Sequence, residues 1–261
     1  MPDEAHEALR DLVRAREAAK QDQLRAGHRL SKFLLRHGRR APSGVQAWTL
    51  KYMDWARQPV QFEPPAQEYT RLDYLHEVEH ANDRVRRLEE AIREAVKLAP
   101  RPMQEVMPAL QGRRGIAQIS AVTIVSELGQ ISRFGRARQL MGYSGAVASE
   151  DSSGKRVQRG PIPQTGNAHL RRVGMEAAWS YRPRPALGGA LRKRPEGLSE
   201  EVKEIAWTGQ HRLPKRYRTL VGAGKDKRKV VTAVGRELLG FIWAIGVQGE
   251  SNSHHRTQVA A

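Results

Sequence analysis

Apolar side chains recur at intervals of three and four residues through the first part of the chain, and charged residues fill the intervening faces. This spacing is typical of an amphipathic helix, and it predicts one long helix over residues 4–37. Gly38 and Pro42 supply the signals that end it. The apolar positions that define the pattern are Leu9, Leu12, Val13, Leu24, Leu30 and Leu34.

A second long helix is predicted over residues 67–98, where Val78, Val85 and Ile92 stand seven positions apart. A seven-residue apolar repeat with one polar residue in the seam, here Asn82, is the pattern of a coiled coil. Two partners for this seam are open. The first long helix would give a hairpin within the chain, and the same helix of a second copy would give a homo-oligomer through residues 67–98.

The chain that follows contains a helix-hairpin-helix-like pattern. A short helix is expected around residues 107–110, then a glycine turn at Gly115, then a helix through residues 121–128. In such motifs the turn presents backbone N–H groups to a DNA phosphate at a helix N-terminus. Arg113 and Arg114 adjoin the turn, so these two residues and Gly115 are candidate nucleic-acid contacts. An ordinary helical turn is the alternative.

The remaining periodic segments complete a mainly α fold. A short helix is expected near residues 48–55, a helix over residues 199–221 that Pro214 kinks or divides, and a last helix over about 228–246. We therefore expect three regions: a long helical coiled-coil arm over residues 1–100, a compact helical domain over residues 101–248, and a disordered tail over residues 249–261.

Charge is distributed unevenly over these regions. The chain of 261 residues carries 45 Lys and Arg against 28 Asp and Glu, a net charge of +17. Residues 1–100 contribute +2, residues 101–150 contribute +3 and residues 151–261 contribute +12. A balanced first part and a basic last part predict a scaffold followed by a nucleic-acid contact.

Several protein classes are excluded by what the sequence lacks. The chain has no cysteine, which excludes disulfides and thiolate metal sites. It has no P-loop, no dinucleotide glycine pattern and no zinc-protease motif, and we expect no metal site. No apolar run approaches the roughly 18 residues of a membrane span, and the charged N-terminus lacks an apolar signal segment. We therefore expect a cytoplasmic protein with no membrane partner.

The stretch from residue 149 to residue 172 carries the candidate chemistry. Two hydroxyls, Ser152 and Ser153, adjoin Gly154, and cations follow closely. A hydroxyl on a loop ringed by guanidinium groups suits attack on a phosphodiester, because the arginines would hold the phosphate and stabilise the charge that develops on it. A basic surface loop that only touches a nucleic-acid backbone is the alternative. The candidate contacts here are Lys155, Arg156, Arg159, Asn167, His169, Arg171 and Arg172.

With its flanking residues, this stretch resembles the C-terminal domain of the insertion-sequence transposases of the IS110 family, relatives of the Piv-like DNA invertases. The blocks that carry the resemblance occur in order and at compatible spacing. They are Gly115-Ile116-Ala117, Ala121, Glu127-Leu128-Gly129, Phe134, Ala137-Arg138-Gln139-Leu140, Tyr143-Ser144-Gly145, Ser153-Gly154 and Gly166-Asn167-Ala168-His169-Leu170-Arg171-Arg172.

The resemblance implies DNA transposition by serine attack on a DNA phosphodiester. The family's nucleophile is the serine before the glycine, which is Ser153 here, and Ser152 is the competing candidate. The family also implies DNA as the partner, a structured guide RNA, and a covalent phosphoserine intermediate. Arg156, Arg159, Arg171 and Arg172 would clamp the phosphate.

The same resemblance implies where the metal chemistry lies. The family carries a RuvC-like N-terminal domain with four metal-binding acids, and residues 1–10 resemble an interior stretch of the family. We therefore expect that this chain lacks that domain, binds no cofactor of its own, and that Mg²⁺ belongs to the RuvC-like domain. A non-enzymatic, dimerising nucleic-acid-binding remnant is the second hypothesis, and covalent capture of DNA separates the two.

Overall fold

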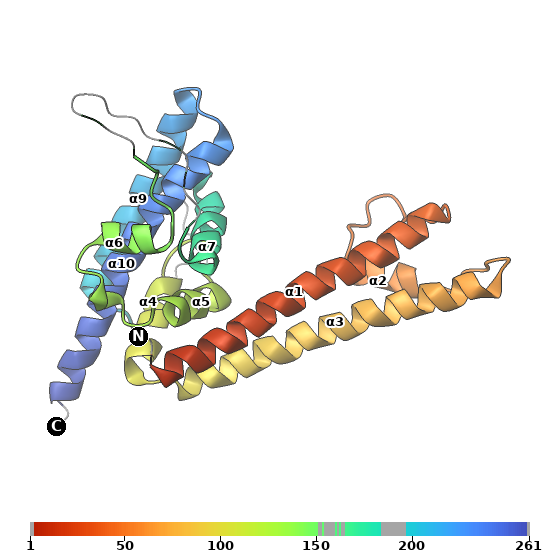
Figure 1. The fold of residues 1–261 in the computed structure, drawn as a ribbon, viewed down its shortest axis with the longest axis horizontal. Helices are drawn as coiled ribbons and strands as arrows, with labels where there is room; N and C mark the ends of the chain where they lie inside the picture. Colours follow the sequence, from red (N-terminus) through yellow and green to blue (C-terminus); the bar gives the residue numbers. More distant parts are fainter. Residues whose placement is uncertain are drawn as a thin grey trace. The chain divides into compact units, whose positions relative to one another are not determined.

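A computed structural model describes residues 3–150, 153, 160, 162, 165–183 and 197–259 (Figure 1). The regular structure of these residues is helical, which confirms the prediction of a mainly α fold. The chain divides into two compact units. We call Asp11–Glu94 the arm, and we call Met1–Arg10 together with Ala95–Ala261 the core unit. The division lies close to the expected boundary at residue 100, except that the first ten residues belong with the core unit.

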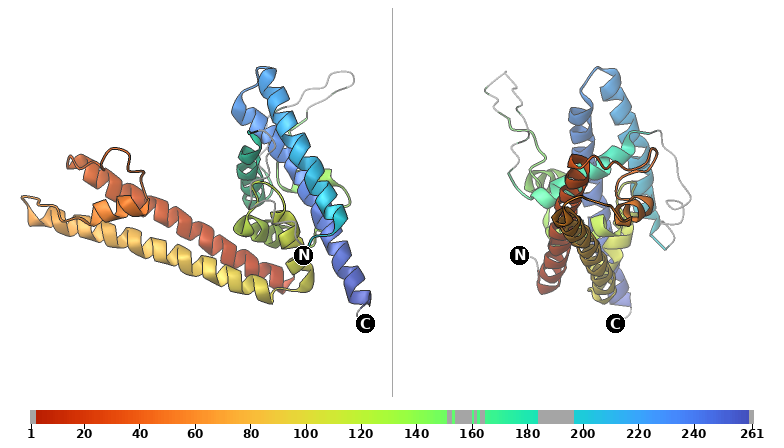
Figure 2. Two further views of the ribbon diagram at one scale, coloured as in Figure 1. Left: turned by 180° about the vertical axis from the view of Figure 1, so that it is seen from behind. Right: turned by 90° about the vertical axis from the view of Figure 1, so that its right-hand side faces the viewer.

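Two long helices and a short one build the arm. They are α1 (Glu4–Arg36), α2 (Leu50–Arg57) and α3 (Pro65–Leu98). Within the arm α1 and α3 lie side by side and run in opposite directions, as both Figure 1 and Figure 2 show. Their apolar faces form one cluster with α2, as the 3.6-residue spacing requires. The cluster contains Ala26, Leu30, Leu34, Tyr52, Met53, Ala56, Leu75, Val78 and Ala81.

The predicted seam is buried inside a single chain. Val78, Val85 and Ile92 are 1%, 6% and 0% exposed. The polar seam residue also finds its partner within the arm, because the Gln23 side-chain amide donates a 2.6 Å hydrogen bond to Asn82 Oδ1. Of the two pairings left open by the sequence, the structure therefore shows the hairpin, and its seam residues are not available to a second copy.

Charged side chains on the arm are matched to one another. Arg84 pairs with Asp22 at 2.7 Å across the two helices, and Arg71 on α3 is 1% exposed. The guanidinium of Arg71 donates to both carboxylate oxygens of Glu68, and it donates at 2.6 Å to the carbonyl of Ala56 at the end of α2. Hydrogen bonds to three acceptors offset the cost of burying that charge, and they fix α2 against α3.

Helix α10 (Lys227–Val259) is the centre of the core unit, and α4, α6, α7, α9 and the short η1 all pack on it. The apolar side chains that face these neighbours include Val230, Val234, Leu238, Ile242 and Ile245, all of them buried. The surrounding elements are α4 (Arg101–Gln111), α5 (Gln118–Leu128), η1 (Ile131–Arg133), α6 (Ala137–Tyr143), α7 (Ala168–Ala178), η2 (Trp179–Tyr181) and α9 (Glu200–Gly222).

Two sequence expectations about the last helices are wrong. The tail from residue 249 is not irregular, because α10 continues to Val259. Glu250 is buried and its carboxylate accepts hydrogen bonds from the backbone N–H groups of Ile131 and Ser132, at 2.6 and 2.9 Å, which fixes this part of the helix against η1. Of the two expectations for Pro214, a kink or a division of the helix, the division is wrong, because Pro214 lies buried inside the single helix α9.

Length and composition distinguish α10 in another way that the sequence patterns did not indicate. Residues 227–253 form a helix long and apolar enough to cross a bilayer, and half of its most apolar window is buried inside the protein. A central core helix meets the same criteria, because it too is covered by apolar neighbours. The packing of α10 against its neighbours accounts for this composition.

Candidate functional site

The serine loop leaves the core unit from a neck, which we define as residues 143–149 together with the described residues 160 and 165–167. The N–H of Gly160 donates to the carbonyl of Ser149, and the N–H of Asn167 donates to the carbonyl of Tyr143, both at 2.8 Å. Ser153 lies on the loop between these segments and is exposed. The other predicted loop residues, Ser152, Lys155, Arg156 and Arg159, lie outside the described residues.

Two glycines allow the neck segments to approach one another. Gly145 and Gly166 have φ angles of +67° and +97°, a region that side-chain-bearing residues rarely adopt. A Cβ on Gly145 would overlap the carbonyl oxygen of Thr165, and a Cβ on Gly166 would overlap the carbonyl oxygen of Tyr143. Both glycines belong to blocks that carry the family resemblance, and the close backbone approach is the physical reason for them.

Asn167 connects the neck to the start of α7. Its side-chain oxygen accepts from the N–H of Leu170 at 2.9 Å, as an N-cap does, and its side-chain amide donates to Glu127 Oε2 at 2.7 Å. Both polar groups are therefore used inside the protein. These hydrogen bonds give Asn167 a structural role at the neck, and its contact with nucleic acid stays a prediction.

Glu127, at the end of α5, anchors the neck through its contacts with Asn167 and Tyr143. It is 1% exposed. In addition to the amide of Asn167, it has Arg10 Nε at 3.9 Å from its carboxylate, and its backbone carbonyl accepts from the Tyr143 hydroxyl at 3.3 Å. A buried carboxylate requires such partners, since an isolated one costs several kcal/mol. Sequence patterns alone assigned no role to Glu127, although its block was among those that carry the resemblance.

Helix α7 places three predicted contact residues beside the neck. Arg171 Nη1 donates to the carbonyls of Ser144 and Thr165, at 2.8 and 3.5 Å, and so joins the two neck segments. Arg172 is exposed and pairs with Glu176 at 3.1 Å. His169 is half-buried and also has an interaction partner. Of the three, Arg171 has the clearest structural task, and its half-buried guanidinium lies at the base of the serine loop.

The prediction that Arg113 contacts phosphate is wrong. Its side chain is 1% exposed. The guanidinium donates to the carbonyls of Ile205 and Ala206 on α9, at 3.2 and 3.0 Å, and lies 4.7 Å from the ring centre of Phe241. Burial lowers the pKa of Arg113, and burial likewise raises the pKa of the neighbouring Tyr181 hydroxyl. Arg113 therefore holds the α4–α5 turn against α9.

The turn between α4 and α5 has the predicted glycine with φ of +81° at Gly115. A Cβ there would lie 2.5 Å from the carbonyl oxygen of Ala177, so the turn packs closely against the end of α7. Arg114 is half-buried and has a partner. At the start of α5, the N-cap residue Ala117 makes no side-chain cap hydrogen bond.

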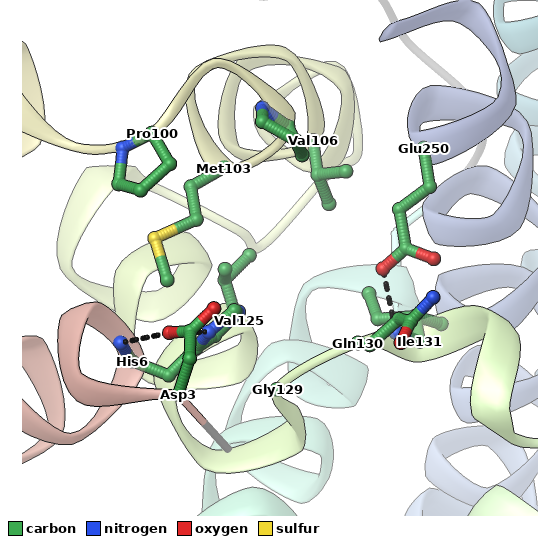
Figure 3. A pocket seen from close by; sticks show the side chains of 11 residues that line it. Asp3, His6, Pro100, Met103, Val106, Val125, Gly129, Gln130, Ile131 and Glu250 are labelled. Atoms are coloured by element: carbon green, nitrogen blue, oxygen red, sulfur yellow. Dashed lines mark hydrogen bonds and ion pairs between the residues drawn. The ribbon is translucent and has the colours of Figure 1, made fainter. Parts of the chain in front are cut away.

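One cavity of about 210 Å³ lies in the core unit between α4, α5 and α10 (Figure 3). Its lining is mostly apolar, and its two carboxylates are already engaged. Asp3 accepts from the N–H and the ring of His6 at the start of α1, and the backbone hydrogen bond from His6 is the main cause that lowers the pKa of Asp3. Glu250 binds the backbone of η1, as Figure 3 shows for Ile131. The geometry therefore gives this cavity no free catalytic group.

Among the described residues, no group of three or more His, Asp or Glu side chains is placed to hold a metal ion. The buried carboxylates of Glu127 and Glu250 are bound to an amide side chain and to backbone amides, respectively. These residues do not form a divalent-cation site, which would need several oxygen ligands that converge on one point.

Comparison with known proteins gives a consistent result. Residues 107–186 match the family described as "Transposase IS116/IS110/IS902 family". The "Putative transposase y4qE" of Sinorhizobium fredii is 41% identical over 246 residues, which cover 94% of this chain and 58% of that protein. The "Transposase for insertion sequence element IS1533" of Leptospira borgpetersenii is 24% identical over 234 residues, which cover 87% of this chain and 64% of that protein.

The chain thus spans about three-fifths of the length of these curated relatives. The matched region contains the α4–α5 turn, the neck of the serine loop and α7. By these matches residues 107–186 carry a domain of the IS116/IS110/IS902 transposase family, and the chain is similar to insertion-sequence transposases over most of its length.

Proposed function

We propose that this chain acts in DNA transposition, as the part of an insertion-sequence transposase that holds DNA and presents Ser153 to a DNA phosphodiester. The observation that carries the proposal is the neck. Gly145 and Gly166 allow the two neck segments to approach one another, and Arg171 joins them. The exposed Ser153 is therefore carried on a loop whose two ends are anchored. Catalysis by a positioned nucleophile depends on an anchored support of this kind.

The proposed step exchanges one ester bond for another. Ser153 Oγ forms a bond to the phosphorus, the bond from phosphorus to one nucleotide oxygen breaks, and that oxygen takes up a proton. The serine proton passes to a base. Serine hydroxyls need such activation, and in the family as a whole the RuvC-like domain would supply the acids and Mg²⁺. This chain's own contribution is to position the serine and to hold the phosphate with cations.

The α4–α5 segment supports a second DNA contact of the helix-hairpin-helix type. The glycine turn at Gly115 and the start of α5, which Ala117 leaves without a side-chain cap, resemble the phosphate-binding end of that motif. Because Arg113 is buried, the contact would rest on backbone amides rather than on its guanidinium.

Other partners follow from the family. A structured guide RNA would share the basic surfaces of the core unit, and the site of action would be the cytoplasm. Homo-oligomer formation through residues 67–98 would have to use a face other than the buried seam. Tyr69, an exposed aromatic side chain of this helix, would be available to such a contact.

Covalent capture of DNA tests the proposal. The chain is mixed with a labelled DNA substrate, Mg²⁺, a guide RNA and the RuvC-like domain of a relative, and adducts are resolved on a denaturing gel. We expect an adduct that needs the added domain, disappears in Ser153→Ala and persists, somewhat weakened, in Ser152→Ala. DNA affinity should be nearly unchanged in both variants.

Three other results would change the assignment. An adduct of full strength in Ser153→Ala would exclude that residue as the nucleophile. Loss in Ser152→Ala alone would move the nucleophile one residue back. Binding without any adduct in the complete mixture would favour the non-enzymatic binding protein.

A further inference from the structure

The strongest concentration of positive charge in the described structure lies at the end of α9 and the start of α10. Between positions 205 and 229 eight side chains are basic and one is acidic, a net charge of +7 against +17 for the whole chain. The basic residues are Arg212, Lys215, Arg216, Arg218, Lys225, Lys227, Arg228 and Lys229.

These cations are exposed, and the protein hardly neutralises them. Within the part of the chain that the structure describes, Arg212 is the one of the eight with an ion pair, to Glu237. The single acid of the stretch, Asp226, is engaged elsewhere, because its carboxylate accepts from the backbone N–H groups of Arg228 and Lys229 at the start of α10. We call six of these exposed cations the basic tip: Lys215, Arg218, Lys225, Lys227, Arg228 and Lys229.

An exposed aromatic pair continues the tip along α9. Trp207, His211, Lys215 and Arg218 follow one another at intervals of four, four and three residues, so they share one face of the helix. Trp207 is 55% exposed, and its ring meets the His211 ring edge-on at 4.3 Å between centroids. At about 1.5 Å per residue, this face extends about 16 Å from the aromatic pair to the last cation.

We propose that this face of α9, together with the basic tip, binds a nucleic-acid backbone and stacks an unpaired base on Trp207. Cations that follow a phosphate backbone beside an exposed aromatic ring form the usual surface for single-stranded nucleic acid. The proposal rests on the proposed function and deepens it, since it adds a nucleic-acid contact made by residues other than those of the serine loop. The proposed binding does not depend on the dipole of α10, because the Asp226 carboxylate already caps the N-terminus of that helix.

Charge complementarity alone would also suit an anionic membrane surface. A membrane-bound helix, however, needs an apolar face beside its cations. The apolar residues of this part of α9, Leu213 and Tyr217, are buried in the core unit, and the exposed face offers Trp207 as its one large apolar group. Nucleic acid is therefore the better-matched partner.

Two triple variants of the basic tip and one matched control, all in the full chain, test the proposal. One variant carries Lys215→Gln, Arg218→Gln and Lys225→Gln, and a second carries Lys227→Gln, Arg228→Gln and Lys229→Gln. The control carries Arg25→Gln, Arg86→Gln and Arg93→Gln, which removes the same number of charges from exposed positions of the arm. Circular dichroism confirms that each variant is folded.

Binding is measured by fluorescence anisotropy with a labelled 20-nucleotide single strand and a duplex, each as DNA and as RNA. We expect each tip variant to bind at least tenfold more weakly and the control to bind like the unmodified chain, because phosphate contacts supply most nonspecific affinity. Trp207→Ala should weaken the single strand more than the duplex, since the stacked base is unpaired.

Three results would overturn the inference: tip variants that bind nucleic acid as tightly as the control, an equal effect of Trp207→Ala on both strand types, or vesicles of anionic lipid that compete with the nucleic acid. The outcome is separate from that of the serine assay. Loss of the adduct in Ser153→Ala tests the loop and leaves tip binding intact, whereas the tip variants test the second contact whether or not an adduct forms.

Discussion

The ion-paired arginines of the arm and the cations of the basic tip differ in how the protein engages them. On the arm, several arginines face acids at helical spacing or across the hairpin, as in the pairs of Arg84 with Asp22 and Arg16 with Glu89. On the core unit, the basic tip is exposed and has no ion pair among the described residues. Charge that is already paired contributes little to binding a polyanion, so the two regions differ in function more than their composition suggests.

Their apolar cores differ as well. The arm is held by the seam between α1 and α3, with α2 added at one end. The core unit is organised around α10, which neighbours cover on several sides. Substitution of any one seam residue should therefore lower the stability of the arm. The stability of the core unit should depend most on the positions where two backbone segments approach closely.

Val85→Asp should have the largest effect on this comparison. It places a carboxylate in the buried seam of the arm and should lower the free energy of unfolding of the arm by about 3–5 kcal/mol. The effect should be confined to the arm in hydrogen exchange. Arg86→Asp, on the exposed side of the same helix, is the control and should cost little. An unmodified chain that sediments as a dimer and becomes a folded monomer in Val85→Asp would show that the seam pairs two copies.

Gly145→Ala should come next, because a Cβ would meet the carbonyl of Thr165 and the backbone has φ of +67°. We expect a decrease of about 2–4 kcal/mol in the unfolding free energy of the core unit, together with disappearance of the serine adduct. Gly142→Ala is the control, since nothing lies within 4 Å of a Cβ there. Equal denaturant midpoints for both variants would show that the neck does not need the glycine.

The substitution Arg113→Ala distinguishes a structural role of Arg113 from a phosphate-binding role. We expect it to destabilise the core unit by about 2 kcal/mol, because it removes the packing on Phe241 and two hydrogen bonds to α9. Nucleic-acid affinity in the folded protein should not change. Weaker binding at unchanged stability would restore the phosphate contact that the sequence predicted.

The smallest effect concerns pH and the ion pairs of the arm. Hydrogen bonds from Arg25 and Arg84 lower the pKa of Asp22, and one from Arg71 lowers the pKa of Glu68. Each carboxylate therefore has a lower pKa in the folded arm than in the unfolded chain. Its contribution is complete above the unfolded values, near pH 4, and is lost as the pH falls through the folded ones. The double variant Asp22→Asn/Glu68→Gln should show a flatter acid dependence of arm unfolding, and an unchanged one would contradict these assignments.

How far the sequence could predict this structure depends on how local each signal is. The limits of α1 and α3 follow from apolar periodicity, and the turn at Gly115 follows from its motif. The burial of Arg113 could not be predicted, because its acceptors Ile205 and Ala206 lie about 92 positions later. The continuation of α10 depends likewise on a partner of Glu250 that is 119 positions away.

The candidate site divides in the same way. The sequence identified the blocks around Gly145 and Gly166, and the structure gives their physical reason as a close backbone approach. It did not identify the anchor at Glu127, whose amide partner Asn167 is 40 residues away. Long-range partners of this kind leave no periodic signal in the chain.

The salt dependence of nucleic-acid binding tests the central claim most directly, namely that the cations of the basic tip contact nucleic acid and the ion-paired arginines of the arm do not. The slope of log affinity against log salt is measured on duplex DNA for the full chain, the first tip variant and the arm control. We predict that the tip variant has a slope shallower by about 0.9 for each phosphate that it no longer neutralises, and that the arm control keeps the slope of the unmodified chain. An equal reduction in both variants, or none in the tip variant, would contradict the account.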